Sequence, residues 1–226
     1  MRLQQYYTPY EVASHNTPTD CWLSFNGGVY DVTQLLQEHP GSLAEPILAA
    51  AGTDISHWFD PTTGDVRTCC DPDTQLPLPY CPQGLFLHVA PVEPTSSYDC
   101  SVQVPWWKDI TLRVGLLSSK TRLVRVKNVL TEQEDTLEVP SEETVGQVRQ
   151  RYLTLNAHAE SYTWKALGRT AGGAGSQFEF RELDLNKTLQ ENGVVDESGA
   201  FESLDMPSDY HVPVLHVYWN DDLTVA

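Results

Sequence analysis

The sequence predicts an α+β protein made of two small domains. Each half of the chain carries its own set of short strands and helices, and a polar, proline-rich stretch at 91–105 between them has no hydrophobic periodicity. A length of 226 residues gives each domain enough chain to bury a core. We therefore expect a first domain over 1–90, a linker over 91–119, and a second domain over 120–222 with a tail at 223–226.

The first domain is expected to open with a short helix and a hairpin. Thr8, with Glu11 three residues later, has the pattern of a capping box and predicts a helix start. The segments 21–25 and 29–32 are typical of strands, and the Asn26-Gly27 dipeptide between them readily takes the positive φ of a tight hairpin. These strands should form the floor of any pocket in this domain.

A histidine lies in a forced bend between two apolar helices. Pro40 disfavours helical backbone at His39 and Gly41 permits a turn, so a helix should end at His39 and leave its imidazole on a loop. A second apolar helix should follow over 43–51. Two apolar helix faces beside a projecting imidazole suit a flat, apolar, iron-containing ring.

The segment His39-Pro40-Gly41 resembles the haem-ligand signature of the cytochrome b5 family, with Ser42 in place of that family's second glycine. Three further stretches are similar to the family's opening helix, first core strand and hairpin: 7–16, 21–23 and 29–33. The resemblance implies a cytochrome b5-like haem-binding fold over about the first ninety residues, the size of one small domain. It also implies haem b as the cofactor and His39 as one axial ligand.

The second axial ligand of that family has no direct counterpart here. Its position falls near Thr63 or Gly64, and neither can replace an imidazole. Cys69 is a candidate, because a thiolate is a competent haem ligand and this segment should cover the open side of the pocket. His57 is a further cofactor-binding candidate, at a helical position that is not a ligand in the family. The alternatives are that Cys69 is an ordinary thiol and His57 a polar residue beside packed aromatic side chains.

The rest of the first half is expected to be less regular. Four prolines between residues 71 and 82 predict irregular structure there, and the segment 85–89 is typical of a strand that completes the domain. Trp106-Trp107 follows the linker and is expected to clasp the two domains together or to contact a partner.

The cysteines predict free thiols, because they number five and no apolar signal-peptide core precedes them. Four potential zinc ligands lack the paired spacing of structural zinc sites: Cys69, Cys70, Cys81 and His88. We expect a soluble, intracellular chain, since no run of residues is long and apolar enough to cross a bilayer. Acidic residues number 31 against 14 basic ones, and the net charge of −17 disfavours nucleic acids and anionic membranes as partners. A basic protein surface fits better.

The second half predicts a hairpin, a helix and two further strands. The segments 121–126 and 136–139 alternate as antiparallel strands do, and strands are also expected at 161–166 and 212–219. A helix between them should place four apolar side chains on one face: Val145, Val148, Tyr152 and Leu155. This order resembles a ubiquitin-like β-grasp domain. The chain ends without a diglycine tail, so the resemblance implies a binding module and not a conjugable tag, and the glycine-rich stretch 168–176 is expected to be a flexible insertion.

Taken together, these parts resemble the cytochrome-b5-domain-containing proteins of motile cilia. Four motifs carry the resemblance: 54–61, 105–107, 161–165 and 189–193. It implies a non-catalytic component of the ciliary axoneme that supports motility, with radial spoke or doublet microtubule proteins as partners and a degenerate, redox-dependent haem site. The alternative is a soluble electron carrier of the cytochrome b5 type. An enzyme is disfavoured, since the chain has no nucleotide-binding loop, nucleophile motif or catalytic dyad.

Overall fold

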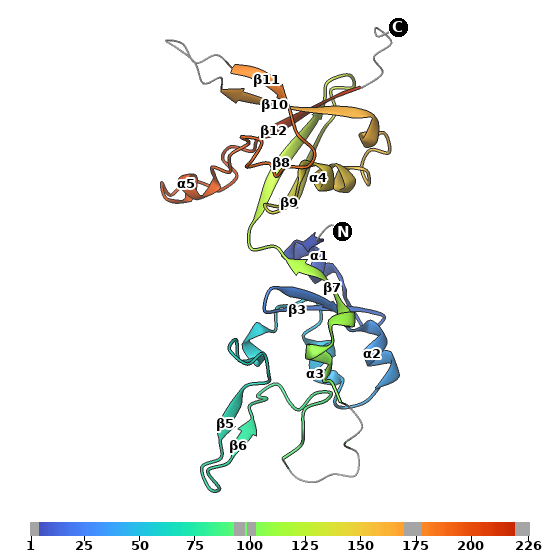
Figure 1. Cartoon of the computed structure of the whole chain (residues 1–226), viewed down its shortest axis with the longest axis vertical. Helices are drawn as coiled ribbons and strands as arrows, with labels where there is room; N and C mark the ends of the chain where they lie inside the picture. Colours follow the sequence, from blue (N-terminus) through green and yellow to red (C-terminus); the bar gives the residue numbers. More distant parts are fainter. Residues whose placement is uncertain (1–4, 93–97, 99–102, 170–177, 220–226) are drawn as a thin grey trace. The chain divides into compact units, whose positions relative to one another are not determined.

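The computed structural model describes residues 5–92, 98, 103–169 and 178–219, and the chain divides into two compact units, Met1–Leu117 and Ser118–Ala226 (Figure 1). Two domains were expected, but the boundary differs. It lies after Leu117, so the first unit takes in nearly all of the stretch expected to be a linker at 91–119. The expected tail at 223–226 lies outside the described residues.

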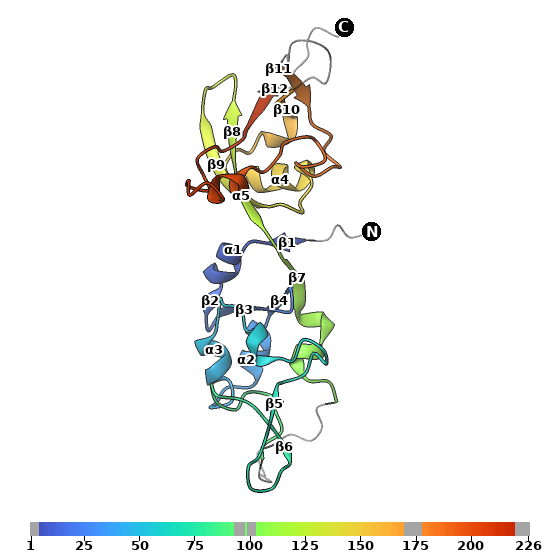
Figure 2. The same ribbon diagram turned by 90° about the vertical axis from the view of Figure 1, so that its left-hand side faces the viewer.

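The first unit contains a five-stranded sheet whose strands, in spatial order, are β1 (Tyr6–Tyr7), β7 (Arg113–Leu117), β4 (Gly28–Asp31), β3 (Asp20–Phe25) and β2 (Asn16–Thr17) (Figure 2). The β3–β4 hairpin is confirmed, and its two turn residues have the expected positive φ, 49° at Asn26 and 74° at Gly27. β1 pairs in parallel with β7, with Tyr6 opposite Leu116. The chain near its start is therefore joined to the last strand of the unit.

Short helices accompany this sheet: α1 (Pro9–Ser14), α2 (Thr33–Glu38), α3 (Glu45–Ala49) and the 3-10 turn η1 (Ser56–Trp58). The capping box of α1 is confirmed, because the Thr8 hydroxyl accepts the Glu11 N–H and the Glu11 carboxylate accepts the Thr8 N–H. α3 is shorter than the expected helix over 43–51.

Two expectations for the remainder of the first unit are wrong. The region 71–82 was expected to be irregular, but β5 (Thr68–Cys70) and β6 (Pro77–Pro79) pair as a separate two-stranded sheet. A strand of such a pair has one edge with no partner, where a proline's missing N–H is tolerated. The segment 85–89 forms turns and no strand, although several of its apolar side chains are buried.

Six buried aromatic side chains, here called the aromatic cluster, fill the core of the first unit: Phe25, Trp58, Phe59, Phe86, Trp106 and Trp107. Trp106 and Trp107 begin the 3-10 turn η2 (Trp106–Lys108), which is followed by η3 (Ile110–Leu112). The Trp106 ring centroid lies 5.8 Å from that of Phe25 and 6.3 Å from that of Phe86. The expected clasp between domains is therefore wrong: these tryptophans are core residues of the first unit.

The second unit is a five-stranded sheet with a helix packed on one face. Its strands, in spatial order, are β9 (Glu134–Pro140), β8 (Thr121–Asn128), β12 (Val214–Trp219), β10 (Tyr162–Arg169) and β11 (Phe178–Glu182). β8 and β12 run parallel in the centre and the other pairs are antiparallel. The expected strands are confirmed, while β11 and the short helix α5 (Ser198–Glu202) were not anticipated.

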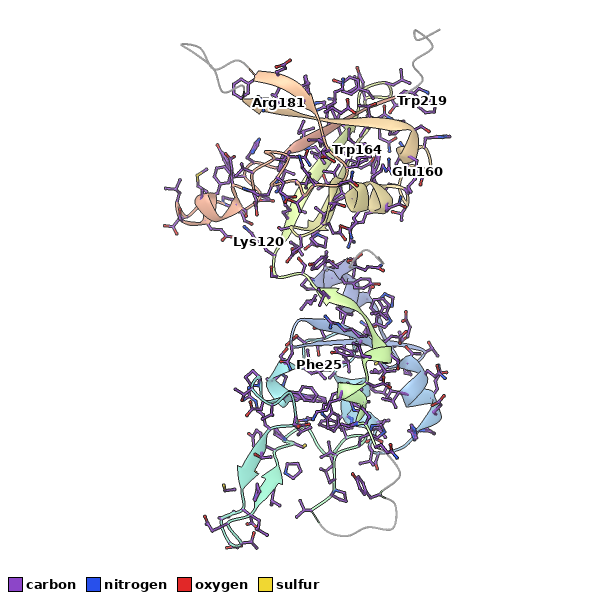
Figure 3. The ribbon with its side chains drawn as sticks, viewed as in Figure 1. Phe25, Lys120, Glu160, Trp164, Arg181 and Trp219 are labelled. Carbon is purple, nitrogen blue, oxygen red and sulfur yellow. The ribbon has the colours of Figure 1, made fainter. Side chains whose placement is uncertain are left out.

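The helix α4 (Val145–Tyr152) supplies the expected apolar face to this core. Val145, Val148 and Tyr152 are fully buried, and Trp164 of β10 points between the sheet and α4 (Figure 3). Leu155 lies beyond the end of the helix and is 54% exposed. Residues 170–177, most of the expected flexible insertion, lie outside the described residues. No helix in the described ranges combines the length and apolar character needed to span a bilayer.

Candidate haem site

His39 stands where the sequence placed it, at the end of α2. Its backbone N–H donates to the Leu35 carbonyl, which closes the helix, and the backbone then turns through Pro40 and Gly41, whose φ is +145°. The imidazole is exposed. It makes no hydrogen bond or ion pair within the described part of the chain, so its ring nitrogens are available to a ligand.

The helices on either side of His39 bury apolar residues in the core that holds the aromatic cluster. Leu36 of α2 and Ile47 of α3 pack there with Leu23 of β3. The expected apolar helix faces are therefore present, and they pack into the core of the unit. Aromatic side chains from η1, from 86–89 and from η2 occupy the same core.

His88 is the imidazole that the fold brings to His39. The two ring centroids are 6.2 Å apart, and the ring planes are nearly perpendicular at 79°. His88 has φ +68°, a left-handed conformation that is uncommon for residues other than glycine. Its Nδ1 accepts the backbone N–H of Trp106 at 2.9 Å. Because Nδ1 is the acceptor, the neutral ring carries its proton on Nε2, which in that state has no lone pair for a metal.

The other predicted ligands lie elsewhere in the first unit. Cys69 is exposed in β5, opposite Leu78 of β6, and this hairpin projects from the body of the unit (Figure 1). His57 is exposed in η1, and its ring neighbour is Trp58. Within the described residues, no hydrogen bond, ion pair or ring contact joins Cys69 or His57 to His39. The structure thus brings His39 to His88 and does not bring the predicted set together.

The environment of two thiols, Cys21 and Cys81, favours their protonated form. Burial raises the pKa of Cys81, and the charge of Cys69 adds to this effect. Burial likewise raises the pKa of Cys21 to about 11. The described residues contain no group of three or more His, Cys, Asp or Glu side chains that could hold a metal ion, so the zinc alternative gains no support there.

Two polar contacts fix the η2 turn beside the site. One is the Trp106 N–H to His88, described above. The other is Asp65, whose carboxylate accepts from Lys108 at 2.7 Å and from the Trp107 indole N–H at 3.3 Å. The hydrogen bond from Lys108 lowers the pKa of Asp65, and the Trp107 bond adds to this. These contacts hold both tryptophans in the core. Sequence spacing gave no signal for them, because the partners are separated by 18 to 43 residues.

Comparison with known proteins identifies the first unit. Residues 8–72 match the model of the cytochrome b5-like Heme/Steroid binding domain. The chain is 52% identical over 221 residues to cytochrome b5 domain-containing protein 1 of Xenopus laevis, covering 97% of this chain and 96% of that protein. The chain belongs to the cytochrome b5 domain-containing protein 1 family. The human member of this family is 46% identical and is matched over 92% of its length.

Among solved structures, this family member is similar to cytochrome b558 of Ectothiorhodospira vacuolata, described as a prokaryotic homologue of cytochrome b5. The match has 32% identity and a TM-score of 0.24, and it covers 28% of this chain and 79% of that one. The residues of the first unit fit haem through one donor, the available imidazole of His39 beside an apolar core. A bound haem would supply reversible one-electron chemistry at iron.

Proposed function

We propose that the chain is a non-catalytic interaction protein with two modules. The first module holds haem weakly through His39, and the second is a ubiquitin-like β-grasp domain that docks the protein in a larger assembly. In line with the resemblance described above, that assembly is the axoneme of motile cilia, with radial spoke or doublet microtubule proteins as partners. The haem site acts there as a sensor or a structural element and not as part of an enzyme.

The arrangement around His39 supports weak haem binding. Tight, low-spin cytochromes of this type need two strong axial donors. His88 is the neighbouring imidazole, and because its Nδ1 accepts the Trp106 amide, its neutral ring carries the proton on Nε2 and offers no free lone pair there. With His39 as the protein's one ligand, the iron should be pentacoordinate and the affinity low. Cys69 remains the alternative sixth ligand, after movement of the β5–β6 hairpin.

The topology of the second unit supports its assignment as a β-grasp module. A hairpin of the first two strands, β8 and β9, is followed by α4. The last strand, β12, then enters the sheet between β8 and β10, parallel to β8. This central parallel pair, crossed by one helix, is the arrangement that ubiquitin-like folds share. A module of this kind without an active site has recognition as its use.

Haem titration of the purified chain tests the first module. We expect a weak, high-spin spectrum that His39→Ala abolishes and His57→Ala leaves unchanged. A low-spin ferric spectrum that Cys69→Ala converts to high spin would instead establish Cys69 as the sixth ligand. Tight binding with a reversible low-spin spectrum that survives the Cys69 change would favour the electron carrier.

Deletion of residues 118–226 tests the second module. The structural boundary allows this cut without removing any strand of the first unit. We expect the shortened protein to be lost from extracted axonemes, while deletion of 1–117 leaves the remaining unit bound. If the first unit alone were retained, the docking role would belong to the cytochrome b5-like domain.

A further inference from the structure

The strand β11 forms one edge of the sheet of the second unit, beside β10 (Figure 1). All five of its residues are exposed, and no other strand in the described ranges pairs with its outer side. Two of its side chains are large and apolar: Phe178 is 63% exposed and Phe180 is 44% exposed. An exposed edge strand offers backbone N–H and C=O groups, here with apolar surface beside them, to a further strand.

The pairing of β11 with β10 determines which backbone groups point to the outer edge. The Leu183 N–H, just after β11, donates to the Trp164 carbonyl at 2.8 Å. In an antiparallel pair, positions bonded in this way recur at every second residue, so positions 179 and 181 also direct their backbone groups toward β10. The alternate positions direct their N–H and C=O groups to the outer edge: Phe178, Phe180 and Glu182.

The other strand edges in the described part of the chain are protected against pairing with a further strand. β1 and β2, at the edges of the first sheet, contain two residues each. β5 and β6 contain three residues each, and β6 begins and ends with proline. β9, at the opposite edge of the second sheet, carries only negative charges and ends at Pro140. Short strands, prolines and like charges are the features that prevent edge pairing. β11 is longer than the first four, contains no proline and carries charges of both signs.

The sequence of β11 is complementary to itself in the antiparallel direction. It reads Phe178-Glu179-Phe180-Arg181-Glu182, so that opposite charges flank Phe180. When two copies pair with Phe180 opposite Phe180, each Glu179 lies opposite Arg181 of the other copy, at a position where cross-strand side chains are closest. Opposite charges and aromatic rings that face each other across two strands are stabilising.

Charge also selects this register over its neighbours. Only positions that point outward can exchange backbone hydrogen bonds, so the pairing can shift only in steps that match such positions. Placing Phe178 opposite Phe180 brings the two Glu179 side chains together. Placing Phe180 opposite Glu182 brings the two Arg181 side chains together. Like charges directly opposite each other are destabilising, so the symmetric register is favoured.

We propose that β11 is a dimerisation surface, at which a second copy of this chain adds its own β11 and the two sheets continue into one. The contact is isologous, because the same strand faces itself across a two-fold axis. Phe180 lies on the sheet face that carries His216, with 4.8 Å between their ring centroids, so the two phenylalanines would form one apolar strip on that face. The contact between two five-residue strands is small, so the isolated dimer should be weak. This inference goes beyond the proposed docking role, because it makes a pair of chains the unit that docks.

Sedimentation equilibrium of the full chain tests for the dimer. Chains of net charge −17 repel one another, so the measurement is made at about 0.15 M salt, where the Debye length is about 8 Å. We expect the dimer fraction to rise as the concentration increases from about 10 to about 500 μM. Hydrogen exchange followed by NMR locates the contact. The amides of Phe180 and Glu182 should become protected as the dimer forms, whereas those of Glu179 and Arg181, which face β10, should not change.

Charge reversal tests the register. Arg181→Glu (Arg181 is labelled in Figure 3) and Glu179→Arg each place like charges opposite each other, twice in a symmetric dimer, and should each weaken association at least about ten-fold. The two changes combined in one chain should restore association. An equimolar mixture of the single variants should associate better than either alone, because each chain then supplies the charges that the other needs.

The matched control is Glu160→Arg, which changes the net charge as Glu179→Arg does but lies at an exposed position outside β11 (Figure 3). It should leave association unchanged. The NMR signals of α4 should be the same in all variants, because the substituted side chains are exposed and the core of the second unit is untouched.

Three results would each overturn the proposal. The first is a chain that stays monomeric over the whole concentration range, and the second is a mixture of single variants that associates no better than its components. The third is full protection of the Phe180 and Glu182 amides at high dilution, which would mean that the chain covers this edge itself. None of these results decides the docking role, which deletion of 118–226 tests separately.

Discussion

The two units build their cores in different ways. In the second unit, the core side chains come from regular elements at alternating positions, such as Val124 and Val126 of β8 and Leu215 and Val217 of β12. In the first unit, many of the largest core side chains come from turns and loops, and polar contacts to Asp65 and His88 hold two of them in place. Periodicity specifies the one core, whereas individual contacts between distant segments specify the other. The first core should therefore depend more on single residues.

The largest effect is expected from Trp106→Ala. The side chain is 1% exposed and contacts four other aromatic rings, so its removal leaves a cavity that should cost the first unit about 3–5 kcal/mol. Denaturant unfolding, followed by NMR signals of each unit, measures the loss. Trp219→Ala is the control, because that tryptophan is 44% exposed at the end of β12 and should cost far less. An unchanged midpoint for the first unit would contradict the assignment of Trp106 to its core.

Leu215→Ala should produce the reciprocal result. Leu215 is fully buried on the central strand β12, and its truncation should cost the second unit about 2–5 kcal/mol. The same NMR signals should report an unchanged first unit. Equal destabilisation of both units would mean that they unfold as one cooperative body.

Alkaline pH should weaken the first unit through Cys21. Burial raises the pKa of this thiol from its ordinary value of 9.0 to about 11, so the unfolded chain loses the proton first. Stability is therefore fully present below pH 9 and decreases as pH rises toward 11. Cys21→Ala should remove this part of the pH dependence in unfolding measurements at pH 8 and pH 10.5. An equal slope in the variant would assign the effect to other groups, such as Tyr30, whose pKa burial also raises.

Mild acid should weaken the second unit slightly through His216. Burial, assisted by the charge of Lys127, lowers its pKa below the ordinary 6.5, while Glu134 opposes the shift. The unfolded chain then binds the proton first, so stability is lost as pH falls below 6.5. We expect a small fall in the unfolding temperature between pH 7 and pH 5.5, and His216→Gln should flatten it. A larger fall in the unfolding temperature of the first unit over the same pH range would show that the first unit, and not the second, is the more sensitive to mild acid.

Local signals predicted the regular elements well. The capping box at Thr8 and Glu11 and the Asn26-Gly27 turn act within a few residues, so the sequence alone defines them. β11 was missed because all five of its residues are exposed and it shows no alternation of burial. The segment 85–89 was misassigned because an apolar run indicates burial without specifying backbone conformation.

The candidate site was predicted only in its local part. The bend at His39 follows from Pro40 and Gly41, which are its immediate neighbours. The approach of His88 depends on its left-handed backbone and on a hydrogen bond from Trp106, 18 residues away. The stretch between His88 and Trp106 is rich in proline, so the sequence predicted a domain boundary there. No pattern in the sequence reveals that the chain returns to the first core after it.

The parallel pairing of β1 with β7 limits how early the first unit can fold while the chain is being synthesised. Tyr6 and Tyr7 cannot pair until Leu116 and Leu117 have been made, and the aromatic cluster cannot be completed until Trp106 and Trp107 have been made. Ribosomes add about 5–20 residues per second, so several seconds separate the synthesis of the first and last strands of this sheet. Phe59 is made 47 residues and Phe86 20 residues before Trp106, so for part of that interval the nascent chain carries these side chains without the indoles that cover them.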